Sequence, residues 1–336
     1  MKVYEIQNSF GLDSLTIAER PEPNPSYGQV LIKVRAVSLN YRDLMVVKGL
    51  YNPNIPLPLI PFSDGAGEVV AVGEGVTRVK VGDRVAGIFF QDWIAGQLTT
   101  AKTHSALGGA IDGMLAEYVV LHENGLVHVP AHLTDAEAAT LPCAAVTAWN
   151  ALFHSGSLKA GETILVQGTG GVSIFALQFA KIAGARIIAT SSNDEKLEKV
   201  KQLGASDTIN YKQNPQWGKT ARELAGVEGV DLIVEVGGAG TLNESLQAVR
   251  IGGQISLIGV LSGVSGEIST VSILMKSVRV QGIYVGSREM FEAMNQAMTL
   301  HQIKPVIDRT FPFSEAREAL KYMESGSHFG KICIQM

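Results

Sequence analysis

A glycine-rich turn is the part of the sequence whose residue types and spacing most directly imply chemistry. Residues 168–173 read GTGGVS and stand between an apolar run and a helix-forming segment. Gly168 permits a tight turn, and Gly170 lets the backbone approach a pyrophosphate, which the free N–H groups at a helix start attract. In this context the pattern predicts a dinucleotide site; the alternative is a turn that merely packs tightly, with Ser173 replacing the usual third glycine. The expected contacts are Gly168, Thr169, Gly170, Gly171 and Val172.

The end of the following strand selects between the two nicotinamide dinucleotides. NAD sites usually place Asp or Glu there to bind the ribose 2′-hydroxyl. This chain has Ser191 and Ser192 at that point, with Lys196 one helical turn later. Hydroxyl groups and a cation suit a 2′-phosphate, because a charge contact at about 4 Å contributes up to about 4 kcal/mol near a protein surface. The segment therefore favours NADPH over NADH, although Asp194 and Glu195 could reach back, and Lys196 could instead be a solvated helix cation.

The elements around this turn alternate between strand and helix. Continuous apolar runs bounded by glycine suit parallel strands that are covered on both faces. A charged amphipathic helix is expected at 194–203, ending at Gly204. The alternation predicts an α/β fold with a doubly wound parallel sheet of the Rossmann type. The expected strands are residues 163–167, 186–190, 230–234, 254–258 and 278–283.

The first third of the chain has a different, β-rich character. Residues 28–37 and 67–73 alternate apolar and polar side chains, as half-buried strands do. A segment at 90–112 has little periodicity, and its Phe90 and Trp93 either line a substrate opening or pack within the loop. The C-terminal part of the chain predicts two helices and a closing strand. These three elements are expected at 288–300, 314–326 and 331–336.

Composition narrows the classes of function. The chain has 336 residues, 28 Lys and Arg against 32 Asp and Glu, and a formal net charge of −4. Nucleic-acid binding is not expected, because there is no basic excess to neutralise phosphates. No apolar run approaches the roughly 18 residues of a membrane span, and the N-terminal residues do not resemble a signal peptide. Cys143 and Cys333 cannot form a disulfide framework, so a reducing cytoplasm is the expected location.

The chain resembles the medium-chain dehydrogenase/reductase superfamily over essentially its whole length. The segments that carry the resemblance are residues 38–43, 64–69, 81–85, 139–143, 166–172 and 285–288. They are most similar to the zinc-free branch that contains the quinone oxidoreductases, whose members are often called zinc-type alcohol dehydrogenase-like. The resemblance implies a β-rich GroES-like catalytic domain at 1–126 and 287–336, with the Rossmann dinucleotide-binding domain inserted at 127–286. It also implies a homodimer joined across the strand at 278–283.

The positions that match zinc ligands of the superfamily carry other residue types. Zinc-dependent members hold the catalytic metal with a cysteine, a histidine and a second cysteine or acid. The matching residues here are Asn40, Ser63 and Cys143, a poor zinc shell because zinc prefers imidazole, thiolate or carboxylate ligands. The four-cysteine lobe of the superfamily is also missing, since segment 90–112 contains no cysteine. We therefore expect no zinc, and Cys143 is either a small buried residue or a reactive thiol.

The resemblance implies further contacts to the dinucleotide. Arg288 matches a residue that contacts the pyrophosphate, although it could be only a surface charge at a helix start. Thr147 matches a threonine near the nicotinamide, or else bonds to its own helix. Tyr211 resembles a tyrosine near the 2′-phosphate and adenine, with a structural role as the alternative. The remaining expected contacts lie at or after the ends of later strands and are Gly237, Ile258, Val285 and Ser287.

Without a metal, the chemistry that is easiest to support is hydride delivery to an activated acceptor. Alcohol oxidation needs the hydroxyl polarised, which zinc does as a Lewis acid. A quinone or a conjugated C=C bond spreads the developing charge onto oxygen, so one or two protein donors suffice. Asn40 is the expected donor, and Tyr51 resembles the tyrosine that assists proton delivery in related enoyl reductases, or else forms a wall of the site. The expected catalytic set, in a cleft between the domains, is Asn40, Asp43, Tyr51, Ser63 and Asp64, with both aspartates orienting neighbours.

These observations lead to one main hypothesis and two alternatives. The main hypothesis is a zinc-independent, NADPH-dependent oxidoreductase that transfers hydride to a quinone, enone or related small carbonyl compound. The first alternative is an NAD(P)-dependent alcohol or aldehyde dehydrogenase. The second is a non-catalytic dinucleotide-binding protein with a redox-sensing role, because a fold does not fix a function. The sequence does not identify the substrate, since its pocket is built from loops.

Overall fold

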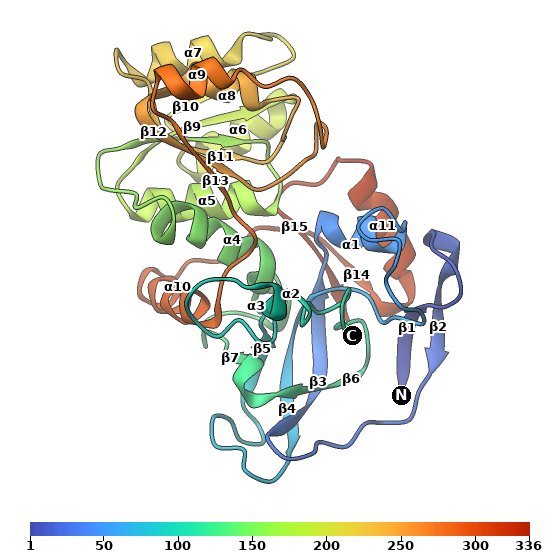
Figure 1. The fold of residues 1–336 in the computed structure, drawn as a ribbon. Coiled ribbons are helices and arrows are strands. Elements are labelled where there is room, and N and C mark those ends of the chain that lie inside the picture. The colour runs from blue at the N-terminus through green and yellow to red at the C-terminus, as the bar shows by residue number, and fades with distance from the viewer. The chain divides into compact units, whose positions relative to one another are not determined.

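The chain folds into two compact units, and the computed structural model describes all 336 residues (Figure 1). Unit 1 comprises Met1–Val146 and Gly286–Met336, and unit 2 comprises Thr147–Val285. The boundary therefore lies after Val146 rather than after residue 126, where the sequence placed it. The reason is that β7 (Leu126–His128) pairs antiparallel with β5 (Arg84–Gly87) and so ties the segment that follows to unit 1.

Unit 2 contains the expected doubly wound sheet. Its six strands run in the order β10-β9-β8-β11-β12-β13, and every neighbouring pair is parallel. The chain enters at β8, moves outward through β9 and β10, then returns to the other side of β8 at β11. The point between β8 and β11 is thus the topological switch point, where such sheets bind ligands at the carboxyl ends of the strands. The strands are β8 (Thr163–Gln167), β9 (Arg186–Ser191), β10 (Asp207–Asn210), β11 (Val230–Glu235), β12 (Val249–Leu257) and β13 (Arg279–Gly282).

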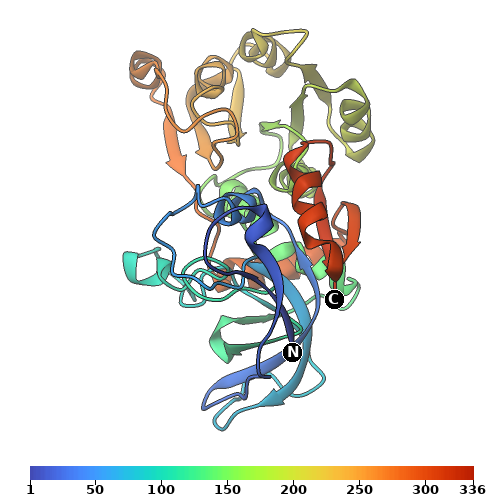
Figure 2. The ribbon, with the colours of Figure 1, turned by 90° about the vertical axis from the view of Figure 1, so that its right-hand side faces the viewer.

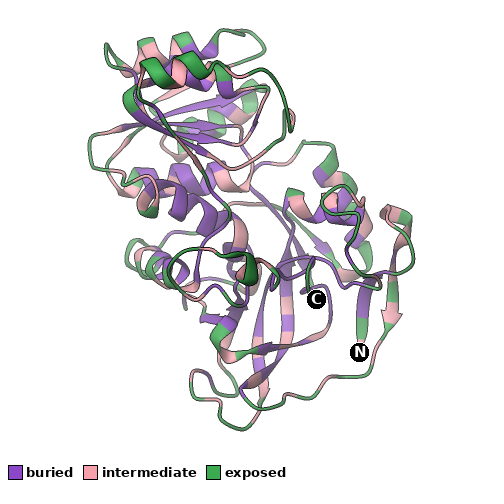
Figure 3. Cartoon of the chain, in the orientation of Figure 1, coloured by how far each residue is buried: buried purple, intermediate pink, exposed green.

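Burial explains the continuous apolar strands of unit 2. Leu165, Ile188, Ile233 and Ile255 stand on neighbouring strands, are fully buried, and belong to one apolar core (Figure 3). The predicted helix at 194–203 is confirmed. The Asn193 side chain caps its start by accepting a hydrogen bond from Lys196 N. The helices of this unit are α5 (Gly171–Ile182), α6 (Asp194–Leu203), α7 (Trp217–Ala225), α8 (Leu242–Ala248) and α9 (Thr270–Met275), with α4 (Val146–Trp149) at the boundary.

Unit 1 is built on a mixed sheet whose strands come from both ends of the chain (Figure 2). The strand near the C-terminus, β15, pairs antiparallel with β3, so Ile332 O accepts a hydrogen bond from Leu39 N. This pairing brings residue 331 beside residue 39. The order is β14-β15-β3-β4-β5-β7, with β6 on β3. The strands introduced here are β3 (Gln29–Ser38), β4 (Asp64–Val72), β6 (Tyr118–His122), β14 (Ile307–Pro312) and β15 (Lys331–Gln335), and β1 (Lys2–Ile6) with β2 (Leu15–Glu19) forms a separate pair.

The long segment at 90–112 is mostly irregular and packs tightly at its start. Phe90 and Trp93 are buried, with ring centroids 6.1 Å apart, so they form part of the loop's own packing. No helix in the structure is both long and apolar enough to cross a membrane. The helices of unit 1 are α1 (Tyr41–Val47), α2 (Thr100–Thr103), α3 (Asp135–Ala139), α10 (Arg288–His301) and α11 (Ala316–Glu324).

Candidate active site and dinucleotide site

A buried polar cluster forms in unit 1 where β3 ends and α1 begins. Asn40 is the N-cap residue of α1, a position that favours asparagine because helix starts carry unpaired N–H groups. Three residues later, Asp43 accepts a hydrogen bond from Asn40 N at 2.7 Å through its Oδ2 atom. The aspartate therefore fixes the backbone at Asn40, as expected for an orienting residue.

The Asn40 side chain is held between a lysine and a serine. Lys331 Nζ donates to Asn40 Oδ1 at 2.6 Å and to Leu39 O at 2.5 Å. Asn40 Nδ2 points the other way and donates to Ser63 Oγ over a long 3.4 Å. The amide oxygen is thus bound by an ammonium group, and the amide N–H groups face Ser63.

Ser63 and Asp64 continue this network to the third position that matches a zinc ligand. Ser63 Oγ donates to Asp64 Oδ1 at 2.7 Å, and Cys143 N donates to Asp64 Oδ2 at 3.0 Å. Asp64 thus contacts both Ser63 and the Cys143 backbone, and its role in orienting them stays a prediction. The structure brings four of the five expected catalytic residues into one hydrogen-bonded group, namely Asn40, Asp43, Ser63 and Asp64.

The cluster contains two carboxyl groups and two cations. Asp43 and Asp64 are both fully buried. Burial raises the pKa of Asp43 to about 6, against the opposing effect of the Arg42 charge. Burial also raises the pKa of Asp64, and the Lys331 ammonium and the Ser63 hydroxyl act in the opposite direction. Lys331 is therefore an electrostatic counterweight to both carboxyl groups as well as a hydrogen-bond donor to Asn40.

The fifth expected catalytic residue, Tyr51, lies beside Arg42. Its side chain is 37% exposed, and the Arg42 guanidinium carbon stands 5.2 Å from its ring centroid, a cation–π distance. Arg42 Nη1 donates to Leu107 O at 2.6 Å and lies 3.7 Å from Asp43 Oδ1. Arg42 thus connects Tyr51 with the buried cluster.

The side chains at the three matching positions do not fit a zinc ion. Asn40 Oδ1 already faces the Lys331 ammonium, whose charge disfavours a second cation. Ser63 uses its proton to bind Asp64, and an amide, a hydroxyl and one cysteine are not the set of imidazole, thiolate and carboxylate ligands that zinc prefers. No group of three His, Cys, Asp or Glu side chains is arranged to hold a metal ion.

The glycine turn of unit 2 leaves room for a ligand. Gly168 has a left-handed backbone with φ of 70°, and a Cβ atom added to Gly168 or Gly170 would meet no heavy atom within 4 Å. Helix α5 begins at the next residue, so its free N–H groups face this space. Ser173 Oγ donates to Gln167 O at 2.5 Å, which explains why serine replaces the third glycine. The cradle therefore fits a dinucleotide pyrophosphate.

The residues expected near the 2′-phosphate gather where β9 and β10 end. Tyr211 N donates to Ser191 O at 3.1 Å, which places the two side by side. Lys196 stands in the first turn of α6. The carboxylate of Asp194 accepts hydrogen bonds from Asn210 Nδ2 at 2.7 Å and Gln213 Nε2 at 2.9 Å. Both oxygens of the Asp194 carboxylate thus bind side chains at or after the end of β10. This weakens the alternative in which Asp194 reaches back to a ribose hydroxyl.

The other expected dinucleotide contacts in unit 2 surround the ends of β11, β12 and β13. Gly237 N donates to Glu235 Oε1 at 2.8 Å, and Ile258 N donates to Glu235 O at 2.8 Å. Val285 has φ of 60°, and its carbonyl accepts from Asn150 Nδ2 at 2.7 Å. The remaining expected contacts are Thr147, buried on α4, Thr169, buried in the turn, Val172 on α5 and Ser192 after β9.

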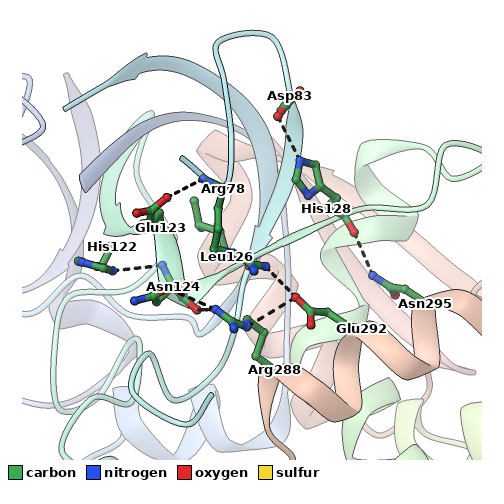
Figure 4. A network of polar contacts seen from close by, with 10 residues as sticks. All are labelled: Arg78, Asp83, His122, Glu123, Asn124, Leu126, His128, Arg288, Glu292 and Asn295. Atoms are coloured by element: carbon green, nitrogen blue, oxygen red, sulfur yellow. Dashed lines mark hydrogen bonds and ion pairs between the residues drawn. The ribbon is translucent and has the colours of Figure 1, made fainter. Parts of the chain in front are cut away.

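Arg288 is engaged within unit 1 (Figure 4). Its Nη1 donates to Asn124 O at 2.9 Å, and its Nε lies 3.5 Å from Glu292 Oε1. Arg78 Nη2 shares that same glutamate at 2.7 Å, and burial together with the Arg78 charge lowers the pKa of Arg288. Ser287 accepts a hydrogen bond from Met290 N and caps α10. A pyrophosphate contact by Arg288 stays a prediction.

Three residues of these sites were missed by sequence reasoning. Lys331 opens a strand whose next three residues are apolar, and a lysine beside such a run was the available signal. Gln167 and Glu235 end two apolar strands of unit 2, and both are buried. A polar residue at the end of an otherwise buried strand was the feature of the sequence that could have identified each of them.

Comparison with known proteins finds family matches in both units. Residues 26–131 match the family described as alcohol dehydrogenase GroES-like domain, and residues 171–299 match the family described as zinc-binding dehydrogenase. A zinc-type alcohol dehydrogenase-like protein of Schizosaccharomyces pombe is 46% identical over 335 residues, covering 97% of this chain and 96% of that protein. An acryloyl-coenzyme A reductase of Metallosphaera sedula is 30% identical over 326 residues, covering 95% of each. A solved Sinorhizobium meliloti protein assigned as an alcohol dehydrogenase has a TM-score of 0.92 at 42% identity, covering 100% of this chain and 98% of that one.

Proposed function

Because the chain belongs to the medium-chain dehydrogenase/reductase superfamily, whose members are NAD(P)-dependent oxidoreductases, we propose that it reduces conjugated carbonyl compounds with NADPH and without zinc. The substrates are small enones, unsaturated thioesters or quinones. The observation that carries the proposal is the orientation of Asn40, whose amide oxygen is bound by Lys331 and whose Nδ2 is left as a hydrogen-bond donor. A relative that is 30% identical is an acryloyl-coenzyme A reductase, which supports the same class of acceptor.

The buried cluster supplies what such a reduction needs from the protein. When bound, NADPH supplies the hydride. As the conjugated acceptor gains that electron pair, negative charge develops on its carbonyl oxygen, and a preorganised donor stabilises it. Asn40 Nδ2 provides that donor, since its hydrogen bond to Ser63 Oγ is a weak one at 3.4 Å. The reduction is completed by one proton, for which the partly exposed Tyr51 is the proposed source.

The dinucleotide is held by residues of unit 2. The open backbone at Gly168 and Gly170, with the start of α5, binds the pyrophosphate. Ser191, Ser192 and Lys196 bind a 2′-phosphate, and no carboxylate stands at the end of β9 to repel it. This arrangement supports NADPH as the preferred cofactor.

We also propose that the protein is a homodimer joined through β13. This strand is the edge of the parallel sheet and has only β12 as a neighbour. Edge strands with unpaired N–H and C=O groups are ready to pair with another chain. Helix α9, just before it, exposes Val271, Leu274 and Met275 by 66%, 74% and 73%. Covering these apolar side chains with the same surface of a second copy would remove them from water.

The deciding experiment follows NADPH oxidation in enzyme dialysed against a chelator, with metal analysis of the same sample. An enone, an unsaturated thioester, a quinone and an alcohol with NADP⁺ serve as substrates. Turnover of a conjugated acceptor by enzyme that holds no zinc supports the proposal. Turnover only of the alcohol, restored by added zinc, would establish an alcohol dehydrogenase instead. Tight NADPH binding with no turnover of any acceptor would favour a binding protein.

A further inference from the structure

Lys331 is a lysine in a place where lysine is costly. It is 4% exposed at the start of β15, and taking an ammonium group out of water costs several kcal/mol unless its contacts compensate. Neither hydrogen bond of its Nζ atom goes to a carboxylate. Its two hydrogen bonds go to neutral oxygens, Leu39 O and Asn40 Oδ1. The charge of Lys331 also stabilises the ionised forms of Asp43 and Asp64, but its direct hydrogen bonds go to Leu39 O and Asn40 Oδ1.

The contact with Asn40 has a specific chemical effect. An asparagine amide has one end that donates and one that accepts, and the two have nearly the same shape. An ammonium group donates only, so the amide must turn its oxygen toward Lys331. Nδ2 is then forced to the opposite side, where Ser63 Oγ takes one of its two N–H groups. The amide also lies close enough to Asp64 for a hydrogen bond that lowers the pKa of that carboxyl, so a substrate oxygen would take the Nδ2 donor in place of Asp64.

We propose that Lys331 is a positioning residue that fixes the Asn40 amide as a donor to the carbonyl oxygen of the substrate. Without it, the amide can rotate by half a turn and present an oxygen to the developing negative charge, which repels it. The inference rests on the proposed reduction of conjugated carbonyl compounds. It adds a cation from the end of the chain to a site whose other residues come from 40–64 and 143.

A purely structural role gives different expectations. The bond from Lys331 to Leu39 O also attaches β15 to the end of β3. If that were the whole role, removing the lysine would lower the melting temperature and leave the kcat of the folded enzyme unchanged. The role in positioning predicts a loss of kcat that is shared with Asn40.

The test is a double-mutant cycle measured with an enone and NADPH. We expect K331M and N40A each to lower kcat at least tenfold, with the Kd for NADPH within about twofold of the wild type. The double variant is expected to be no worse than the poorer single variant, because the two residues act as one unit. K331R should recover most of the activity. K321M, which removes an exposed lysine paired with Glu318, is the matched control and should not change kcat.

Several outcomes overturn the inference. A wild-type kcat in K331M would do so, as would losses that multiply in the double variant. If K331M does not fold, N40D replaces it, because a carboxylate at that position still accepts from Lys331 and has no N–H to offer. A wild-type kcat in N40D would then refute the proposal.

An inactive wild-type enzyme would refute the proposed function and leave the inference to be decided by structure. Crystal structures of the wild type and K331M serve that purpose. Neutron diffraction on these crystals locates the amide hydrogens, which X-rays at ordinary resolution do not. The inference requires the Asn40 amide to contact Ser63 through Nδ2 in the wild type and to lose that orientation in K331M. An unchanged amide in K331M refutes it.

Discussion

Gln167 and Glu235, the last residues of adjacent strands β8 and β11, are joined by a hydrogen bond of 2.6 Å from Gln167 Nε2 to Glu235 Oε2. They stand on the two sides of the topological switch point of the parallel sheet. Glu235 is fully buried, and its carboxylate accepts five hydrogen bonds in all. The other donors are Gly237 N, Gly238 N, Thr241 Oγ1 and Ser245 Oγ. The pair therefore lies at the edge of the sheet where the proposed dinucleotide would bind.

Replacing Glu235 by glutamine should weaken dinucleotide binding. The new NH₂ group must face a donor, which leaves a buried N–H or hydroxyl unpaired at a cost of about 1–3 kcal/mol. We expect E235Q to raise the Kd for NADPH about tenfold, measured by fluorescence titration. E223Q, at an exposed position on α7, is the control. A wild-type Kd in E235Q would show that the carboxylate does not shape the crevice.

A small side chain at Gly170 should block the cofactor without harming the fold. Its φ of −79° is ordinary for any residue, and no heavy atom lies within 4 Å of an added Cβ. We expect G170V to melt within a few degrees of the wild type and to raise the Kd for NADPH at least tenfold, because the side chain fills the pyrophosphate position. Calorimetry and titration on the same sample check both statements. Unimpaired NADPH binding would place the pyrophosphate elsewhere.

Lys196 should contribute to the choice between NADPH and NADH. Removing a cation beside a 2′-phosphate affects NADPH alone, and about 1.4 kcal/mol of lost attraction corresponds to a factor of ten. We expect K196A to lower the ratio of kcat/KM for NADPH over NADH about tenfold. K201A removes a lysine that pairs with Glu198 on the same helix and should leave the ratio unchanged. An unchanged ratio in K196A would assign Lys196 to the solvated helix surface.

Asp43 should make stability depend on pH in a defined direction. Burial raises its pKa from 3.8 to about 6, so between these values the folded chain binds more protons than the unfolded chain. Its contribution to the free energy of unfolding is present at low pH and is lost as pH rises through 6, by up to about 3 kcal/mol. D43N cannot titrate and should gain stability relative to the wild type between about pH 4 and about pH 8. Urea unfolding at both pH values measures the difference in free energy of unfolding between D43N and the wild type. A difference that is the same at both pH values would contradict the prediction.

A charge on α9 should separate the proposed dimer. Leu274 is exposed in the single chain and would be covered in the dimer. We expect L274R to shift the molar mass from dimer to monomer in light scattering, because burying an unpaired charge is unfavourable. V227R, at an exposed position between α7 and β11, is the control and should remain dimeric. A wild-type chain that is monomeric at micromolar concentration would refute the dimer itself.

Local signals in the sequence predicted the scaffold of unit 2 well. The turn at Gly168 and the helix that ends before Gly204 are each determined by residues that are close in sequence. The types and spacing of those residues were therefore enough to predict the two elements. The candidate catalytic residues were predicted through resemblance; the structure brings Asn40, Asp43, Ser63 and Asp64 together, and their catalytic roles stay a prediction. Lys331 could not be predicted this way, because its contact with Asn40 spans 291 residues and exists only through the pairing of β15 with β3. The domain boundary was misplaced for a similar reason, since β7 belongs to unit 1 through its pairing with β5.

The pairing of β15 with β3 also determines when the candidate active site can form during synthesis. Asn40 leaves the ribosome early, and its partner Lys331 follows 291 residues later. Unit 2 is continuous in sequence and can fold on the nascent chain, whereas unit 1 must wait for its missing strand. A translation product that stops short of β15 would therefore contain the glycine turn of unit 2 and lack the lysine that binds Asn40.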